Sequence, residues 1–141
     1  MNLVDSSGWL EYLADGENAK FFAPALEDVN NLIIPSICVY EVSKKIIQQK
    51  SEHEALQVAA LMHQGRIIDL DLDLSISAAR LSIAHKLPMA DSIVLATSKS
   101  FQAVIWTQDV DFQGMKDVKF ISKKNNEQEI SNCALRKFFI E

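Results

Sequence analysis

Short apolar runs alternate along the chain with longer segments whose apolar residues recur at helical spacing. The short runs predict strands at residues 2–5, 32–34, 66–70, 103–107 and 118–121. The longer segments predict a helix that begins at residue 6 or 7 and further helices over about residues 19–29, 36–50, 51–65, 74–86 and 90–100. Because strands that alternate with helices are typical of βαβ units, the pattern predicts a mainly parallel, five-stranded sheet.

Polar residues at the boundaries support this division into elements. Ser6 or Ser7 is expected to cap the helix after the first strand, and Ser36 the helix after the second, because a serine hydroxyl accepts hydrogen bonds from first-turn N–H groups. Ser51 and Glu54 have the spacing of a capping box. These serines therefore mark the predicted starts of separate helices.

The chain of 141 residues is expected to form a single domain over residues 1–141. Hydrophobic residues make up 48% of the sequence and charged residues 23%, as in compact globular proteins, and no repeat or flexible linker divides it. A tail after about residue 123 is polar first and then apolar, so its end is expected to dock on a surface that the sequence does not identify.

The apolar runs are too short to cross a bilayer, and residues 1–20 lack the basic-then-apolar pattern of a signal peptide. A cytoplasmic protein without membrane contact is therefore expected. Cys38 and Cys133 stand alone, which disfavours a disulfide or a zinc site and fits a reducing compartment. Cys38 lies in an apolar stretch and is expected to fill the core.

The formal charge of −5 means that the average surface repels a polyanion. A nucleic-acid partner would then need bound divalent cations or a local basic patch. Lys44, Lys45, Lys50 and Lys86 are candidates for phosphate attraction, and solvated helix faces explain them nearly as well.

Acidic residues follow the predicted strands at the edge where parallel sheets gather their functional groups. Asp5 ends the first strand, Glu41 lies in the helix after the second, Asp91 opens the helix before the fourth, and Asp109 follows the fourth. Taken singly, Asp91 could complement a helix N-terminus, Asp109 could be a loop acid and Glu41 an exposed helix residue. The coincidence of all four predicts a common site.

Carboxylates brought together raise one another's pKa, and a hard divalent cation relieves that repulsion. Mg²⁺ or Mn²⁺ is therefore the expected cofactor, held by oxygen ligands from the four acids. Such a site suits the hydrolysis of phosphodiesters. Ser6 and Thr107 lie beside it and are candidates for supporting roles. Ser6 could equally serve as a helix cap. The role of Asp111 stays open.

Four sequence stretches, LVDSS, PSICVYEV, LPMADSIVLAT and WTQDVDF, begin at residues 3, 35, 87 and 106. Their order, spacing and placement resemble the PIN-domain nucleases and, within them, the VapC-like toxins of prokaryotic toxin–antitoxin pairs. By position, Asp5, Glu41 and Asp91 match the principal acids of that family, and Asp109 matches its fourth. The tail after about residue 123 falls outside the shared pattern.

The resemblance implies a three-layer α/β/α sandwich around a parallel sheet. It also implies a Mg²⁺- or Mn²⁺-dependent endoribonuclease that hydrolyses RNA, frequent homodimers, and inhibition by a cognate antitoxin protein.

Two alternatives remain at this point. A receiver-like signalling module would use Asp5, Asp69 and Thr107 at strand ends. However, the first strand lacks a paired acid, and this alternative leaves Glu41, Asp91 and Asp109 without a role. A PIN-like domain that has lost catalysis and serves only to bind a partner is the other alternative, because a sequence does not prove that the site is assembled.

Overall fold

A computed structural model of the protein describes residues 1–124 and residue 130. Its sheet has five parallel strands in the order β3-β2-β1-β4-β5. The strands are β1 (Asn2–Val4), β2 (Leu32–Pro35), β3 (Arg66–Ile68), β4 (Val104–Thr107) and β5 (Val118–Phe120). The parallel sheet predicted from the alternation of apolar runs and helical segments is confirmed.

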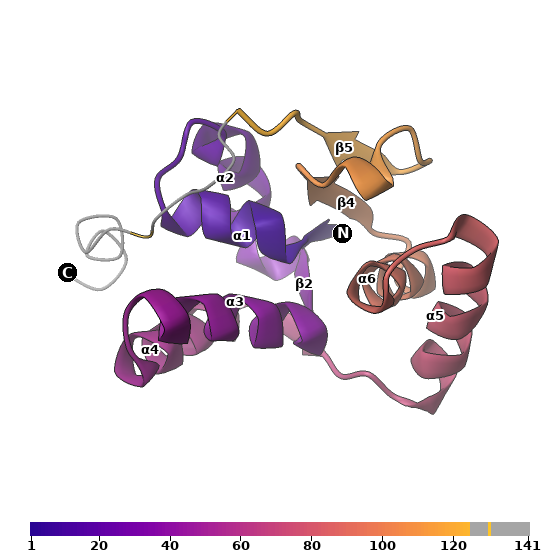
Figure 1. The fold of residues 1–141 in the computed structure, drawn as a ribbon, viewed down its shortest axis with the longest axis horizontal. Helices are drawn as coiled ribbons and strands as arrows, with labels where there is room; N and C mark the ends of the chain where they lie inside the picture. The colour runs from indigo at the N-terminus through magenta and orange to yellow at the C-terminus, as the bar shows by residue number, and fades with distance from the viewer. Residues whose placement is uncertain (125–129, 131–141) are drawn as a thin grey trace.

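Helices cover both faces of the sheet, with α5 and α6 on the opposite side from α1 and α2 (Figure 1). This arrangement confirms the three-layer α/β/α sandwich. The helices are α1 (Ser6–Leu13), α2 (Ala19–Glu27), α3 (Ser36–Gln49), α4 (Glu52–Met62), α5 (Leu72–His85) and α6 (Met89–Ser100), and the short 3-10 helices are η1 (Val29–Asn31) and η2 (Val110–Phe112).

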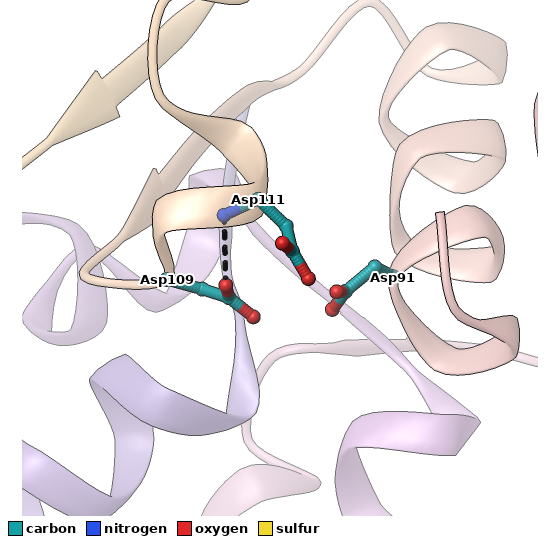
Figure 2. A group of neighbouring side chains, drawn as sticks. All are labelled: Asp91, Asp109 and Asp111. Carbon is teal, nitrogen blue, oxygen red and sulfur yellow. Dashed lines mark hydrogen bonds between the residues drawn. The ribbon is translucent and has the colours of Figure 1, made fainter. Parts of the chain in front are cut away.

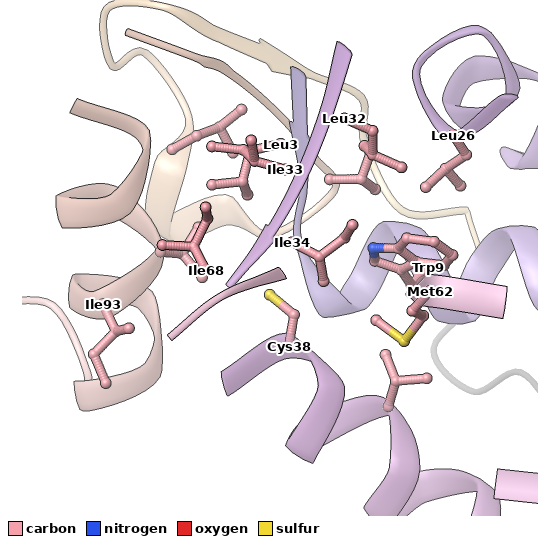
Figure 3. Packing of buried hydrophobic residues seen from close by; sticks show 14 of the residues in the cluster. Leu3, Trp9, Leu26, Leu32, Ile33, Ile34, Cys38, Met62, Ile68 and Ile93 are labelled. Atoms are coloured by element: carbon pink, nitrogen blue, oxygen red, sulfur yellow. The ribbon is translucent and has the colours of Figure 1, made fainter. Parts of the chain in front are cut away.

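Strand β2 contributes buried side chains to the apolar layers on both faces of the sheet. Ile33 lies on the side of α6, whereas Leu32 and Ile34 lie on the side of Trp9 (Figure 3). All of these side chains are buried, and full burial of an aliphatic side chain contributes about 1.5–3 kcal/mol. Cys38 is a buried free thiol within the same core, as its apolar surroundings in the sequence predict.

The first turn of α1 packs very closely on the sheet because its third residue is Gly8. A Cβ at Gly8 would lie 2.5 Å from Cγ1 of Val4 and 2.7 Å from the ring of Phe22. Only glycine allows this approach without displacement of its neighbours. The close contact holds the start of α1 directly at the end of β1.

Two of the predicted serine caps are wrong, and one is confirmed. Asp5 caps α1 by accepting a hydrogen bond from the Gly8 N–H at 3.0 Å, and the helix already includes Ser6. A carboxylate in the extended conformation at the end of β1 is a stronger acceptor than the following hydroxyl. Ser36 is the first residue of α3, and the N-cap position is taken by Pro35, whose side chain has no acceptor for a capping hydrogen bond. Ser51 does cap α4, with its Oγ accepting from the Glu54 N–H at 3.2 Å.

The predicted docking of the tail falls on residues 131–141, which lie outside the described residues, as does Cys133. Ile130 is described and buried, and its N–H donates to Oε1 of Gln49 at 3.0 Å. Among the described residues, no helix combines the length and apolar character needed to span a membrane.

Candidate active site

Asp5 lies at the end of β1 and is 4% exposed. Its Oδ1 accepts from Ser7 Oγ at 2.7 Å and from the Gly8 N–H, and its Oδ2 accepts from Thr107 Oγ1 at 2.6 Å. Burial raises the pKa of Asp5 from 3.8 to about 6, these hydrogen bonds oppose the rise, and the charge of Asp109 adds to it. The carboxylate is therefore held in one orientation at an energetic cost.

Three other carboxylates form a group from two elements, and Asp5 is not one of the three. One oxygen from each of Asp91, Asp109 and Asp111 lies within 4.8 Å of the others. Asp91 comes from the first turn of α6, and the other two come from the segment around η2 (Figure 2). Oδ1 of Asp109 accepts from the Asp111 N–H at 2.9 Å, so the turn of η2 directs both side chains to the same place.

The pKa of Asp91 is raised from 3.8 to about 8. Burial is the largest cause, and a hydrogen bond shared with Asp111 comes next, because that bond requires a proton between two carboxyl groups. The charges of Asp109, Asp111 and Asp5 raise the pKa further. Near neutral pH, the group without a cation therefore retains a proton.

Glu41 lies on α3 outside this group of three, and Ser6 Oγ of α1 donates to its Oε1 at 3.0 Å. The electrostatic surroundings of the buried Cys38 thiol indicate where Glu41 lies relative to the other acids. Burial raises the pKa of Cys38, and the charges of Asp5, Glu41 and Asp91 each raise it further. All three acids thus act on one point at the carboxyl edge of the sheet.

Thr107 joins the end of β1 to the segment after β4. Its hydroxyl donates to Asp5 Oδ2 and accepts from the Asp109 N–H at 2.9 Å. Because Thr107 is fully buried, these bonds are shielded from competition with water.

The sequence assigned no role to several other polar residues at this edge. Asp111, whose role was left open, joins Asp91 and Asp109 in the structure. Glu11, Asn18 and Gln108 are buried polar residues next to the acids. The position of Gln108 between Thr107 and Asp109 is a sequence feature that could have identified it. No sequence feature marks Glu11 or Asn18.

The donor set contains only carboxylate oxygens, the ligands that Mg²⁺ and Mn²⁺ prefer. A hard divalent cation at this group would offset the burial and the repulsion that together keep Asp91 protonated. The residues present therefore fit such an ion.

The sequence profile of the PIN domain matches residues 3–118, and the chain belongs to the PIN-domain family. A search of curated proteins gives no significant match.

Solved structures with the same fold include toxins and their complexes. A toxin–antitoxin complex from Klebsiella pneumoniae aligns with a TM-score of 0.73 and 21% identity, over 84% of this chain and 96% of that one. Mycobacterium tuberculosis VapC20, a sarcin-ricin loop cleaving toxin, aligns with a TM-score of 0.68 and 17% identity, over 84% and 98%. VapBC2 from Rickettsia felis, bound to a DNA fragment from its promoter, aligns with a TM-score of 0.66 and 11% identity, over 86% and 97%. At these identities the likeness shows a VapC-like PIN fold.

Proposed function

We propose that this protein is a divalent-metal-dependent endoribonuclease and the toxin of a toxin–antitoxin pair. The observation that carries the proposal is the group of three carboxylates beside Asp5, in which the pKa of Asp91 rises to about 8. A fold does not ordinarily retain such mutual repulsion for structural reasons. A cation-binding site accounts for it.

In this proposal, Asp5, Asp91 and Asp109 hold the cation, and Asp111 joins them. Bound there, Mg²⁺ or Mn²⁺ would polarise a phosphodiester and lower the pKa of a bound water. Glu41 either binds the cation as well or orients the attacking water.

Two hydroxyls support the acids. Ser6 fixes the rotamer of Glu41 through its hydrogen bond, and Thr107 fixes Asp5. Both acids thus keep their orientation while substrate binds, so little reorganisation is needed at the moment of reaction.

RNA is the proposed substrate because of the resemblance of the four motifs to VapC-like toxins and the fold shared with a toxin that cleaves the sarcin-ricin loop. A cognate antitoxin is the proposed partner, since a structure of the same fold is a toxin–antitoxin complex. A homodimer, a single-domain organisation and a cytoplasmic location are proposed on the resemblance and the sequence.

The receiver-like alternative loses its support. The strand order β3-β2-β1-β4-β5 differs from the 2-1-3-4-5 order of flavodoxin-like folds, and Asp69 is exposed after β3. The inactive alternative predicts a weakened acid set, whereas Asp5, Glu41, Asp91 and Asp109 are all present at one edge.

The decisive experiment compares the Asp91→Asn variant with the Asp73→Asn variant, because both residues are acids in the first turn of a helix. Cleavage of assorted RNAs with Mn²⁺ is expected to fall more than about 100-fold in Asp91→Asn and to persist in Asp73→Asn. A chelator should abolish cleavage by the unmodified protein, and the protein encoded by a neighbouring small reading frame should inhibit it. Mn²⁺ binding without cleavage of any RNA would favour the inactive alternative, and full activity of Asp91→Asn would contradict the assignment.

A further inference from the structure

Behind the acids lies a cluster of polar side chains that none of the proposed catalytic steps uses. Glu11 on α1, Asn18 before α2 and Gln108 after β4 are 3%, 2% and 5% exposed. We call these residues the buried polar cluster. Polar groups this deeply buried destabilise a fold unless their hydrogen bonds are made, so their contacts need a physical account.

Hydrogen bonds connect every pair of residues in the buried polar cluster. The Asn18 N–H donates to Glu11 Oε1 at 2.9 Å, and Gln108 Nε2 donates to Glu11 Oε2 at 3.4 Å. Asn18 Nδ2 donates to Gln108 Oε1 at 3.0 Å and to the carbonyl of Ser122, just after β5, at 3.0 Å. The cluster thus ties α1, the α1–α2 loop and the chain after β5 to the end of β4.

Gln108 connects this cluster to the acids. It stands directly between Thr107, which binds Asp5, and Asp109. Its N–H donates to Ser7 Oγ and its Nε2 donates to the Ser7 carbonyl, both at 3.5 Å, and Ser7 Oγ in turn donates to Asp5 Oδ1. One side chain therefore contacts the cluster and the start of α1 while its backbone carries Asp109.

The segment that follows Gln108 carries two of the acids. Asp109 lies directly before η2 and Asp111 lies on it, and one oxygen of each is within 4.8 Å of an oxygen of Asp91 on α6. This convergence depends on where the segment is held relative to α6. Near the acids, the described contacts that hold it include those of Thr107 and the buried polar cluster.

We propose that Gln108, fixed by Glu11 and Asn18, is a positioning residue that holds Asp109 and Asp111 in place against Asp91 before a cation binds. This inference rests on the proposed metal site and deepens it. Gln108 does not touch substrate or cation; it acts by preorganising the ligands that do.

The first test replaces Gln108 with Met, which keeps the length of the side chain and removes its amide. The matched control is Gln113→Met, because Gln113 is exposed in the same segment. Calorimetry should show Mn²⁺ affinity about 10-fold weaker in Gln108→Met and unchanged in Gln113→Met. In the metal-free protein, amide hydrogen exchange over residues 109–113 should accelerate only in Gln108→Met.

RNA cleavage by Gln108→Met and Gln113→Met provides an independent test. A positioning role predicts that Gln108→Met lowers kcat and leaves KM for RNA unchanged, because RNA contacts are retained. A loss of melting temperature with unchanged Mn²⁺ affinity and unchanged exchange over 109–113 would reduce Gln108 to a structural residue and overturn the proposal.

A charge exchange covers the case in which Gln108→Met does not fold. Gln108→Glu places a second carboxylate beside Glu11 and is expected to weaken Mn²⁺ binding. The double variant Glu11→Gln/Gln108→Glu restores an amide–carboxylate pair and should recover part of the lost Mn²⁺ affinity. No recovery in the double variant would contradict the pairing. If the unmodified protein neither binds Mn²⁺ nor cleaves RNA, the proposed function fails, and the hydrogen exchange of residues 109–113 still decides whether Gln108 holds that segment.

Discussion

The apolar core around β2 and the carboxyl edge of the sheet are both buried, yet different forces hold them together. Ile33, Ile34 and Val42 are fully buried in the core, where cohesion comes from removing apolar surface from water. Thr107 is equally buried at the edge, where it is held by hydrogen bonds to named partners. The core has no preferred direction of contact, whereas the edge depends on individual donors and acceptors.

The difference explains where the protein accepts an energetic cost. The edge gathers carboxylates whose pKa values rise to about 6 at Asp5 and about 8 at Asp91, which records unfavourable burial and repulsion. Stability from the core offsets that cost, and the strain is located where chemistry is proposed. Substitutions in the two regions should therefore separate stability from metal binding.

The largest effect on stability is expected from Ile34→Ala in the core. Loss of this fully buried side chain leaves a cavity and should lower the free energy of unfolding by about 2–5 kcal/mol in chemical denaturation. The matched change Ile83→Ala, at a residue 83% exposed on α5, should have little effect. Mn²⁺ affinity of the folded Ile34→Ala variant should be unchanged, and a parallel loss of affinity would show that the two regions are not independent.

A smaller loss of stability, with a loss of metal binding, is expected from Thr107→Val. Removal of the hydroxyl leaves the half-buried Asp109 N–H without its acceptor, which costs about 1 kcal/mol. It should also weaken Mn²⁺ binding about 10-fold in calorimetry, because Asp5 loses its Oδ2 donor.

Thr97→Val is the control for this change. Thr97 is 1% exposed on α6 and its hydroxyl donates only to the Ile93 carbonyl at 2.8 Å, within the same helix. Its replacement should leave Mn²⁺ affinity unchanged. Equal losses of Mn²⁺ affinity in Thr107→Val and Thr97→Val would show that the removal of any buried hydroxyl weakens metal binding. The contacts of Thr107 at the sheet edge would then have no special role.

The last comparison concerns the pH dependence of stability in the presence of a chelator. The folded-state pKa values of Asp5 and Asp91 lie above 3.8, so both groups bind protons more tightly when folded, and their contribution is complete at low pH. It is lost as the pH rises through about 6 for Asp5 and about 8 for Asp91. The free energy of unfolding should therefore decrease over that range.

In Asp91→Asn, the part of this decrease that falls between about pH 6 and pH 8 should disappear, because the titrating group is gone. Denaturation curves at several pH values measure the difference between the two proteins. An identical slope in the variant would show that Asp91 does not titrate in this range.

Much of the architecture is encoded locally. The alternation of apolar runs and helical segments is sufficient to predict the parallel sheet, because a period of two or of 3.6 residues determines which side chains can be buried together. Strand ends then place Asp5 and Asp109 at one edge, since parallel strands all end on the same side. Ser51 and Glu54 were sufficient to predict the start of α4 for the same reason, as a capping box is a local contact.

Contacts between distant segments were decided only by the tertiary structure. Ser6 and Ser7 read equally well as caps, but the fold uses Asp5 as the cap and turns Ser6 toward Glu41, which is 35 residues away. The bonds of Gln108 to Asn18 and Glu11 span 90 and 97 residues. No local pattern marks such pairs, because a hydrogen bond across the fold depends on where two backbones meet in space. The sequence by itself determined the elements and the edge at which the acids gather, and only packing decided which polar groups hold them there.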